Sequence, residues 1–465
     1  MGSQETRTES DSMGEMEVPV DAYYGASTQR ALLNFPISEL RLTRRMIRAL
    51  GLIKWAAAKT NADLGRLDAK QAKAIQQAAL EVADGKFDDQ FVVDIYQTGS
   101  GTSSNMNANE VIANRAAEIL GAARGAKDVV HPNDHVNRGQ SSNDVIPTTV
   151  HLSALMSITE ILEPALERLE QALRDKSKAF WDVIKTGRTH LQDATPIRLG
   201  QVFVGYAGQI ERGRRRVEQA KQELAEVALG GTAVGTGLNT HPEFASRACA
   251  AISERAGVTI HESDNHFQAQ ATLDGVVAAS GALRTVAVSL IKIANDVRLL
   301  ASGPRTGLGE LLLPEVQPGS SIMPGKVNPV IAESLIMVAV QTLANDQALV
   351  RAGEWSFFEL NTMLPMAGYN LIQSIETLGN AAKNFADRCI EGLRATARGP
   401  EMVEQGLAIV TGLVPLIGYD LSAAIAHEAG ASGRTVREVA REKTDLTEEQ
   451  LDAGLDPFKM TAPSE

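Results

Sequence analysis

Residues 273–300 read LDGVVAASGALRTVAVSLIKIANDVRLL, and the pattern of this segment indicates the fold class. It contains no proline, and its apolar residues recur every three or four positions, as on one face of an α-helix. From about Phe267 to Ala301 the spacing predicts a single helix, roughly 50 Å long at 1.5 Å per residue. Helices of this length normally lie beside one another, so we expect a long-helix bundle.

Further long helices are predicted by the same spacing at residues 152–173, 197–229 and 330–351. Pro164 interrupts the first of these segments, where we expect either a kink or a junction between two helices. Strand-like alternation is scarce, and aromatic residues make up only 4% of the chain. The fold class is therefore predicted to be mostly α.

Small residues lie on the faces of several predicted helices, as in the run GVVAASGA at residues 275–282. Such residues allow two helices to approach closely. The approach can take place within one chain or between subunits that share a bundle, and the composition leaves both alternatives open.

The length of 465 residues exceeds what one hydrophobic core usually serves, which favours several domains or one elongated fold. Charged and turn-forming residues become frequent near residue 141 and again near residue 398. We therefore predict an N-terminal domain at residues 1–141, a central helical-bundle domain at 142–397 and a C-terminal domain at 398–465.

The composition is typical of a soluble globular protein, with 44% hydrophobic and 22% charged residues. A net charge of -12 argues against a nucleic-acid partner, because affinity for phosphate backbones comes mainly from Lys and Arg. Anionic substrates remain possible, since a local cationic pocket can oppose the global charge. The two cysteines, Cys249 and Cys389, are too few for a disulfide framework, which favours the reducing cytoplasm.

Neither a membrane span nor a targeting segment is predicted. The longest apolar run, residues 406–419, is short and contains Pro415, so we expect that the chain does not cross a membrane. The first six residues fit the loose N-myristoylation pattern, which is too short to carry a prediction. The segment to about Ser12 lacks the features of a signal peptide, and we expect a flexible tail there.

Four polar, glycine-rich segments interrupt the helical pattern. They read TGSGTSSNMN at residues 98–107, HPNDHVNRGQSSND at 131–144, KTGRTHLQD at 185–193 and GSSIMPGKVN at 319–328. All four offer hydroxyls, amides or cations, which donate hydrogen bonds to carboxylates. If they converge on one point, they form a pocket suited to a carboxylate substrate.

Each segment also has an ordinary structural interpretation, because Ser, Thr, Asn and Asp cap helices and form turns. His131 and His135 are spaced like a metal pair, but Pro132 disfavours a continuous helix and no third ligand is evident. Residues 319–326 are not a phosphate loop, because five residues separate the glycines and a valine follows the lysine. Residues 231–237 likewise lack the dinucleotide fingerprint. We therefore predict no metal and no cofactor.

Three side chains in or beside these segments have types suited to catalysis. His190 lies in a polar turn, although a structural histidine is the usual alternative. Lys326 lies between glycine and proline residues, where the backbone suits a mobile lid over a substrate. Glu333 follows at the start of the next predicted helix, where a carboxylate is favoured by the helix dipole and could also orient a histidine.

Taken together, the four segments resemble the fumarase/aspartase superfamily over nearly the whole chain. The run GSSIMPGKVNP at residues 319–329 is similar to the superfamily signature almost letter for letter, and the other three segments occur in the same order. The resemblance implies a small N-terminal domain, a central long-helix bundle and a small C-terminal helical domain. It also implies a homotetramer with a many-helix core, whose active sites draw residues from three chains.

The resemblance carries over roles for the signature segment by motif position. Ser320 is the expected base that removes the C3 proton of malate, and Lys326 with Asn328 is expected to bind the adjacent carboxylate. Such a proton is weakly acidic, so the aci-carboxylate intermediate needs preorganised cations and donors. A serine is a poor base when free, so the closed loop must also activate it.

The remaining site residues are also implied by the resemblance. His190, with Thr189 beside it and Glu333 to orient it, is expected to protonate the departing hydroxyl, directly or through a water. The expected ligands of the substrate carboxylates are Ser100, Thr102, Ser141, Ser142, Asn143 and Ser321. His131, Asn133 and Asp134 match a secondary anion site near the entrance.

Within the superfamily, three motifs resemble the cofactor-independent class II fumarases more than the aspartases. These are TGRTH at 186–190, TGSGT at 98–102 and SSN at 141–143. The predicted activity is therefore fumarate hydratase, acting on a small dicarboxylate. Three residue features point the other way or depart from the pattern, namely Tyr23-Tyr24-Gly25, Gly139 and Asp128. Aspartate ammonia-lyase is the first alternative, and a catalytically inactive structural homologue is the second.

Overall fold

The computed structural model describes residues 5–463, which contain seventeen α-helices and five two-stranded sheets. The predicted fold class, mostly α with scarce strands, is confirmed. The chain divides into two compact units. Unit 1 comprises Met1–Pro164, Arg215–Ala287 and Val340–Gly379, and unit 2 comprises Ala165–Arg214, Val288–Ala339 and Asn380–Glu465. The boundaries fall within or next to long helices, and the three-domain division at 141 and 397 stays a prediction.

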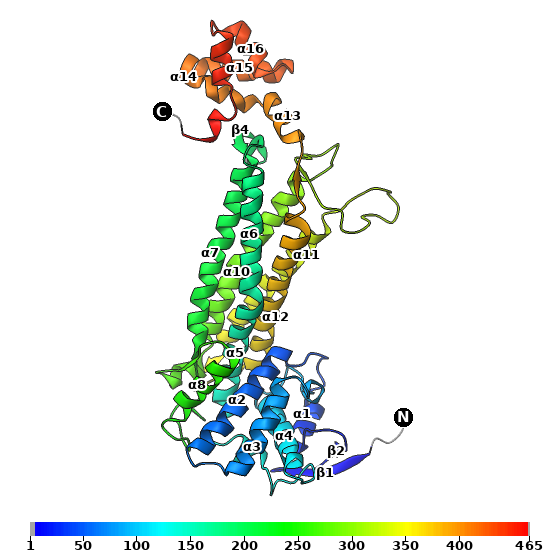
Figure 1. Cartoon of the computed structure of the whole chain (residues 1–465), viewed down its shortest axis with the longest axis vertical. Helices are drawn as coiled ribbons and strands as arrows, with labels where there is room; N and C mark the ends of the chain where they lie inside the picture. The colour runs from blue at the N-terminus through cyan, green and yellow to red at the C-terminus, as the bar shows by residue number, and fades with distance from the viewer. Residues whose placement is uncertain (1–4, 464–465) are drawn as a thin grey trace. The chain divides into compact units, whose positions relative to one another are not determined.

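The N-terminal part of unit 1 consists of a hairpin followed by helices (Figure 1). The elements are β1 (Thr6–Asp11), β2 (Gly14–Pro19), α1 (Ala26–Asn34), α2 (Arg44–Asp63), α3 (Ala69–Ala83), α4 (Thr102–Ile119) and α5 (Ser142–Ser157). Helix α2 packs against α3, α5 and the later helix α8 (Phe244–Ala256). Buried Leu50, Ile53 and Ile75 lie in this core.

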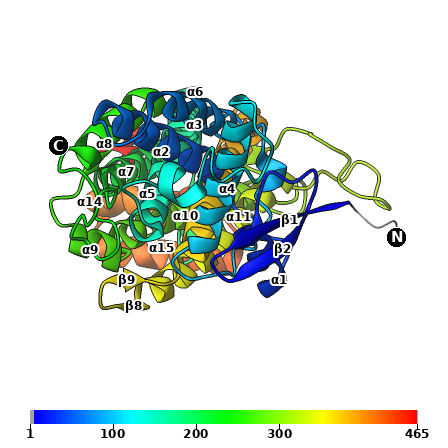
Figure 2. The same cartoon turned by 90° about the horizontal axis from the view of Figure 1, so that it is seen from below.

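The expected flexible tail is wrong for residues 6–11, because they form β1, which pairs with β2 and packs against α1 (Figure 2). Thr8 donates a hydrogen bond to Glu17 across the hairpin at 2.7 Å. Arg7 pairs with Glu9 and donates to the carbonyls of residues 19, 20, 22 and 24. These polar contacts join residues that are well separated in the sequence, so the composition of the tail does not reveal them. Residues 1–4, on which most of the myristoylation pattern falls, lie outside the described residues.

The long helices follow the predicted periodicity. They are α6 (Glu163–Ala179), α7 (Leu199–Ala225), α10 (Asp274–Leu300), α11 (Val330–Gly353) and α12 (Leu364–Phe385). Helix α11 confirms the prediction at 330–351. Helix α7 confirms the prediction at 197–229 except at its ends, because residues 197–198 and 226–227 lie in short strands. The single helix predicted from Phe267 is wrong at its start, because a short helix α9 (His266–Ala271) ends at Thr272, whose backbone is extended. Helix α10 begins anew at Asp274, a carboxylate in the first turn.

Pro164 marks a junction. A π-helical segment, η3 (Ile158–Leu162), lies between α5 and α6, and Pro164 is the second residue of α6. Proline donates no backbone hydrogen bond and its ring crowds the carbonyl four residues before it, so the wider π turn accommodates it. The helical path therefore continues through the proline.

Two helical stretches of the described residues are long and apolar enough to cross a membrane by length and composition, Ser142–Ala179 and Asp274–Leu300. In their most apolar windows, 78% of the first and 50% of the second is buried within the structure. Core helices of soluble proteins pass the same test. The expectation that the chain does not cross a membrane stays a prediction.

The end of the chain forms a cluster of short helices in unit 2. They are α13 (Arg398–Gln405), the 3-10 segment η5 (Leu407–Leu413), α14 (Val414–Ile417), α15 (Tyr419–Ser432), α16 (Val436–Lys443) and α17 (Glu448–Gly454). Their core includes Leu413, Ile425, Val439 and Leu451, together with Ile184 from the hairpin of β3 (Ile184–Thr189) and β4 (Gln192–Arg198). This packing anchors the base of that hairpin.

Three further strand pairs are two residues long. They are β5 (Glu226–Val227) with β6 (His261–Glu262), β7 (Leu311–Leu312) with β10 (Arg394–Ala395), and β8 (Ser356–Phe357) with β9 (Leu360–Asn361).

Candidate active site

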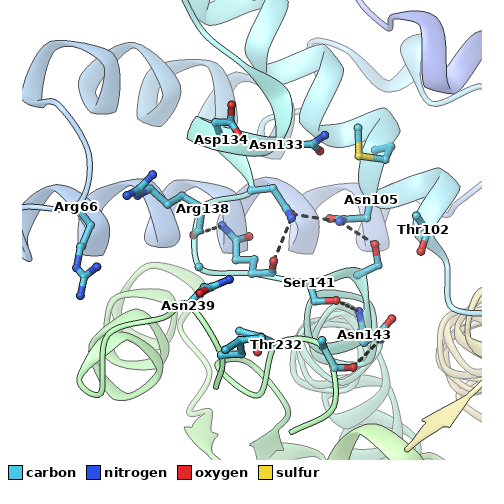
Figure 3. A pocket seen from close by; sticks show the side chains of 17 residues that line it. Arg66, Thr102, Asn105, Asn133, Asp134, Arg138, Ser141, Asn143, Thr232 and Asn239 are labelled. Atoms are coloured by element: carbon cyan, nitrogen blue, oxygen red, sulfur yellow. Dashed lines mark hydrogen bonds between the residues drawn. The ribbon is translucent and has the colours of Figure 1, made fainter. Parts of the chain in front are cut away.

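A cavity of about 830 Å³ lies in unit 1 (Figure 3). Its lining comes from the start of α4, the segment 133–143 that leads into α5, and the loop 232–239. Six predicted residues line it: Thr102, Asn133, Asp134, Ser141, Ser142 and Asn143. Arg66 and Arg138 supply cations to the lining, while Asp134 is its carboxylate. Cations, hydroxyls and amides together suit an anionic ligand.

The start of α4 is shaped by two glycines. Gly101 has φ of 74°, a left-handed conformation that favours glycine, and it caps the helix. A Cβ on Gly99 would lie 1.9 Å from the carbonyl oxygen of Thr362, so only glycine fits there. The turn places Ser100 Oγ 2.8 Å from Thr102 Oγ1. Ser100 is buried and does not line the cavity, but it hydrogen-bonds to Thr102, which does.

The start of α5 is a capping box. Ser141 Oγ accepts the N–H of Asn143 at 3.2 Å, and Asp144 accepts the N–H of Ser141 at 2.9 Å. Asn143 also donates to the carbonyl of Ala233 at 2.8 Å, which joins α5 to the loop 232–239. The structural role of these residues is therefore real, and it coexists with their position on the cavity. Helix N-termini also favour anions through their free N–H groups.

Two buried charges lie behind the lining. Burial raises the pKa of Asp144 to about 6, although its carboxylate accepts backbone N–H groups from Ser141, Gly230 and Thr232. Burial lowers the pKa of Lys54 to about 7, against the opposing effect of Asp144. The sequence prediction missed Lys54, although a lysine within the apolar run GLIKWAAA at 51–58 is a signal that could have revealed it.

The predicted secondary anion site occupies a π-helical turn, η2 (Pro132–Val136). Asn133 and Asp134 line the same cavity as the substrate ligands, whereas His131 does not. His131 Nδ1 accepts the N–H groups of Asn133 and Asp134, each at 3.2 Å. His135 Nδ1 accepts the N–H of His131 at 2.8 Å. The two histidines therefore act as caps here, and no cluster of three or more His, Cys, Asp or Glu side chains suited to a metal occurs in residues 5–463.

His190 lies at the tip of the β3–β4 hairpin in unit 2. Thr189 pairs with Gln192, which makes His190 and Leu191 a two-residue turn with φ of 58° and 59°. Left-handed backbone at two successive non-glycine residues is strained, and such strain clusters at functional sites. His190 and Thr189 are exposed in the single chain.

A buried ion cluster lies below that tip. Glu310 lies 2.7 Å from Arg188 and 3.4 Å from Lys185, and all three side chains are largely buried. Burial lowers the pKa of Lys185, and Glu310 opposes this effect. The carboxylate thus neutralises two cations on β3 and holds the strand that ends at Thr189.

The signature segment 319–328 forms a loop in unit 2 before α11. A Cβ on Gly319 would lie 1.8 Å from the carbonyl oxygen of Lys326, so the two ends of the loop touch. Asn328 Nδ2 donates a hydrogen bond to the carbonyl of Gly319. Ser320 Oγ accepts the N–H groups of Ile322 at 3.2 Å and Met323 at 2.9 Å. Ser321 and Lys326 are exposed.

Glu333 lies in the first turn of α11, as predicted. Its nearest cation is Arg298, at 4.0 Å. In the described part of the chain no hydrogen bond joins Glu333 to His190. The predicted residues outside the cavity lining are Ser100, His131, Thr189, His190, Ser320, Ser321, Lys326, Asn328 and Glu333.

The chain is mostly helical, and hydroxyls and amides at helix N-termini line its cavity. A family model described as Lyase matches it over residues 14–343, which places it in the lyase class. A second family model, described as Fumarase C C-terminus, matches residues 409–462. The class II fumarate hydratase of Halobacterium salinarum is 56% identical over 99% of this chain and 98% of its own length. The protein of that name from Nitrosomonas europaea is 52% identical, over 98% and 99%.

Solved structures agree with these matches. The crystal structure of class II fumarase from Schistosoma mansoni matches with a TM-score of 0.96 and 39% identity, covering 99% of this chain and 100% of that chain. The chain belongs to the class II fumarate hydratase family.

Proposed function

We propose that the protein is a fumarate hydratase, which catalyses the reversible hydration of fumarate to L-malate. The observation that carries the proposal is the cavity at the starts of α4 and α5, where hydroxyls, amides and two arginines face one volume. A small dicarboxylate needs such donors. The relatives that this chain matches at 56% and 52% identity, over nearly their whole length, are named class II fumarate hydratase.

The proposed reaction is an acid/base anti elimination or addition through an aci-carboxylate intermediate. Ser320 is the proposed base. Two backbone N–H groups point at its Oγ, and donors of this kind favour the deprotonated oxygen. Lys326 and Asn328 are proposed to bind the carboxylate next to the reacting carbon, with Ser321 as a further ligand.

The second catalytic group is proposed to be His190, assisted by Thr189 and oriented by Glu333. Ser100, Thr102, Ser141, Ser142 and Asn143 are the proposed carboxylate ligands. Ser141 and Ser142 each accept a hydrogen bond through Oγ, from Asn143 and Asn105, so their own O–H groups are left to donate to a carboxylate. His131, Asn133 and Asp134 are proposed as a secondary anion site.

The proposed assembly is a homotetramer with active sites shared between subunits. Large apolar side chains are exposed on the long helices, including Val288 of α10 and Met337 and Val340 of α11. Light scattering coupled to gel filtration tests this proposal. Met337→Glu is expected to weaken the tetramer, and a monomeric wild-type protein would contradict the assembly.

The protein is further proposed to act in the cytoplasm, without a metal, nucleotide, nucleic-acid partner or membrane. Both cysteines are free and buried, and burial raises each thiol pKa to about 12. Such thiols need no oxidising compartment.

The activity is tested by adding fumarate to the purified protein in plain buffer and following its ultraviolet absorbance. Loss of absorbance without added metal or nucleotide is expected. Consumption only in the presence of ammonium would replace the proposal by aspartate ammonia-lyase. No consumption under either condition would support an inactive structural homologue.

A further inference from the structure

A buried lysine lies directly behind the cavity. Lys54 of α2 has no exposed surface, and its Nζ donates to Asn137 Oδ1 at 2.9 Å and to Gln140 Oε1 at 3.0 Å. Asn137 and Gln140 both line the cavity. Asp144 of α5 is the charged group that acts on Lys54 among the described residues. The bonding partners of this ammonium are thus neutral amides.

The ammonium fixes how these amides are turned. Because an ammonium can only donate, Asn137 and Gln140 present their carbonyl oxygens to Nζ while Lys54 is protonated. Asn137 Nδ2 also donates to the backbone carbonyl of Gln140 at 3.1 Å, which fixes the same orientation of Asn137. Asn137 Oδ1 also accepts from Asn105 Nδ2 at 3.2 Å, and the same Nδ2 donates to Ser142 Oγ at 3.0 Å. Both amide hydrogens of Asn105 are therefore committed, and its orientation follows from Lys54.

In this orientation the amide oxygen of Asn105 has no hydrogen-bond donor. Asn105 lines the cavity and is 1% exposed, and its Oδ1 is buried without a hydrogen-bond partner. Buried polar oxygens in proteins normally accept a hydrogen bond, so we expect a bound ligand or water to donate one here. A dicarboxylate dianion offers only acceptors, but the hydroxyl of malate and the water that adds to fumarate can each donate.

We propose that Asn105 Oδ1 accepts a hydrogen bond from the malate hydroxyl or from the attacking water, and that Lys54 is the positioning residue that holds Asn105 for this contact. The inference rests on the proposed function and extends it. Asn105 hydrogen-bonds to the hydroxyl, whereas the serines and arginines bind the carboxylates. It explains why a lysine is buried behind an anion site.

The contact is tested with Asn105→Ala and a matched control, Asn109→Ala. Asn109 lies one turn further along α4 and is also buried with an unpartnered Oδ1, but it does not line the cavity. Asn105→Ala is expected to lower kcat/KM for malate about 10- to 100-fold, while Asn109→Ala changes it less than about 3-fold. Inhibition by succinate, which has no hydroxyl, is expected to be unchanged in both variants. Equal weakening of malate and succinate by Asn105→Ala would overturn the contact.

The positioning role is tested by a double-mutant cycle. Lys54→Met and Asn105→Ala are expected to be non-additive in kcat/KM, with the double variant close to the Asn105→Ala variant. Lys59→Met, an exposed lysine on the same helix that pairs with Asp63, is the control and is expected to change little. Additive effects of Lys54→Met would overturn the role.

If Lys54→Met does not fold, Asn137→Ala removes the amide that joins Lys54 to Asn105. The double-mutant cycle with Asn105→Ala is then measured with this variant, and the same outcomes apply. Wild-type protein that does not convert fumarate would refute the proposed function. A fully active wild type with additive variants would refute only the inference.

Discussion

The carboxylate of Asp144 accepts the backbone N–H of Thr232 at 2.9 Å. The same oxygen accepts the N–H of Gly230 at 3.1 Å, while the other oxygen caps α5 through Ser141. One buried side chain thus joins two walls of the cavity, and Thr232 keeps a left-handed backbone with φ of 55° there. Asp144 is the structural link on which the cavity depends.

Asp144→Asn is expected to lower the free energy of unfolding by about 1–3 kcal/mol, because one acceptor oxygen is replaced by a donor facing N–H groups. The raised pKa of about 6 adds a pH dependence. A carboxyl whose pKa is raised in the folded state stabilises it most below its unfolded pKa, and this contribution is lost as pH rises through about 6. Urea unfolding across this range should show a steeper decline in the wild type than in the Asp144→Asn variant, because burial raises the pKa of Glu110 and Glu376 in both proteins.

His190→Asn is expected to slow turnover by about 10²- to 10⁴-fold, because it removes the proposed acid. Asparagine tolerates a left-handed backbone, so the hairpin and the thermal midpoint should be preserved. His261→Asn, an exposed histidine of β6, serves as the control. Normal turnover by the His190 variant would remove His190 from the mechanism.

Gly319→Ala is expected to reduce turnover by at least about 10²-fold, because its Cβ would overlap the Lys326 carbonyl and misplace Ser320. The exposed loop contributes little to folding, so the thermal midpoint should change by no more than a few degrees. Gly325→Asn is the matched control in the same loop, since φ of 76° and open space suit asparagine. Equal losses in both variants would contradict the close contact at Gly319.

Glu310→Gln is expected to destabilise the protein by about 3–5 kcal/mol, because it leaves the buried cations of Lys185 and Arg188 without their carboxylate. Turnover should fall as well, since Arg188 lies two residues before His190. Glu448→Gln removes the partner of exposed Arg441 and is expected to leave the denaturant midpoint nearly unchanged. Denaturant midpoints check both variants, and similar losses would show that the Glu310 cluster is not structurally important.

Helix positions followed from local periodicity wherever the pattern was long. Residues 330–351 lie within α11 as predicted, because burial of one helical face repeats at a fixed spacing. The break at Thr272 and the hairpin at residues 6–19 were missed. The hairpin is fixed by contacts between residues far apart in sequence, such as the bond from Arg7 to the backbone carbonyl of Tyr24, which periodicity does not register.

The candidate site divides in the same way. The motifs identified Thr102, Ser141, Ser142 and Asn143 by residue type, and the structure brings all four to one cavity. Lys54 and Asn105 were not singled out, because their importance lies in burial and in an unpartnered oxygen.

The helical class, the family resemblance and the residue types available for chemistry follow from local spacing and composition, which the sequence contains directly. Only contacts made on folding bury Lys54 behind the cavity and let Asp144 join two of its walls. Hydrogen bonding and desolvation depend on which groups meet after folding.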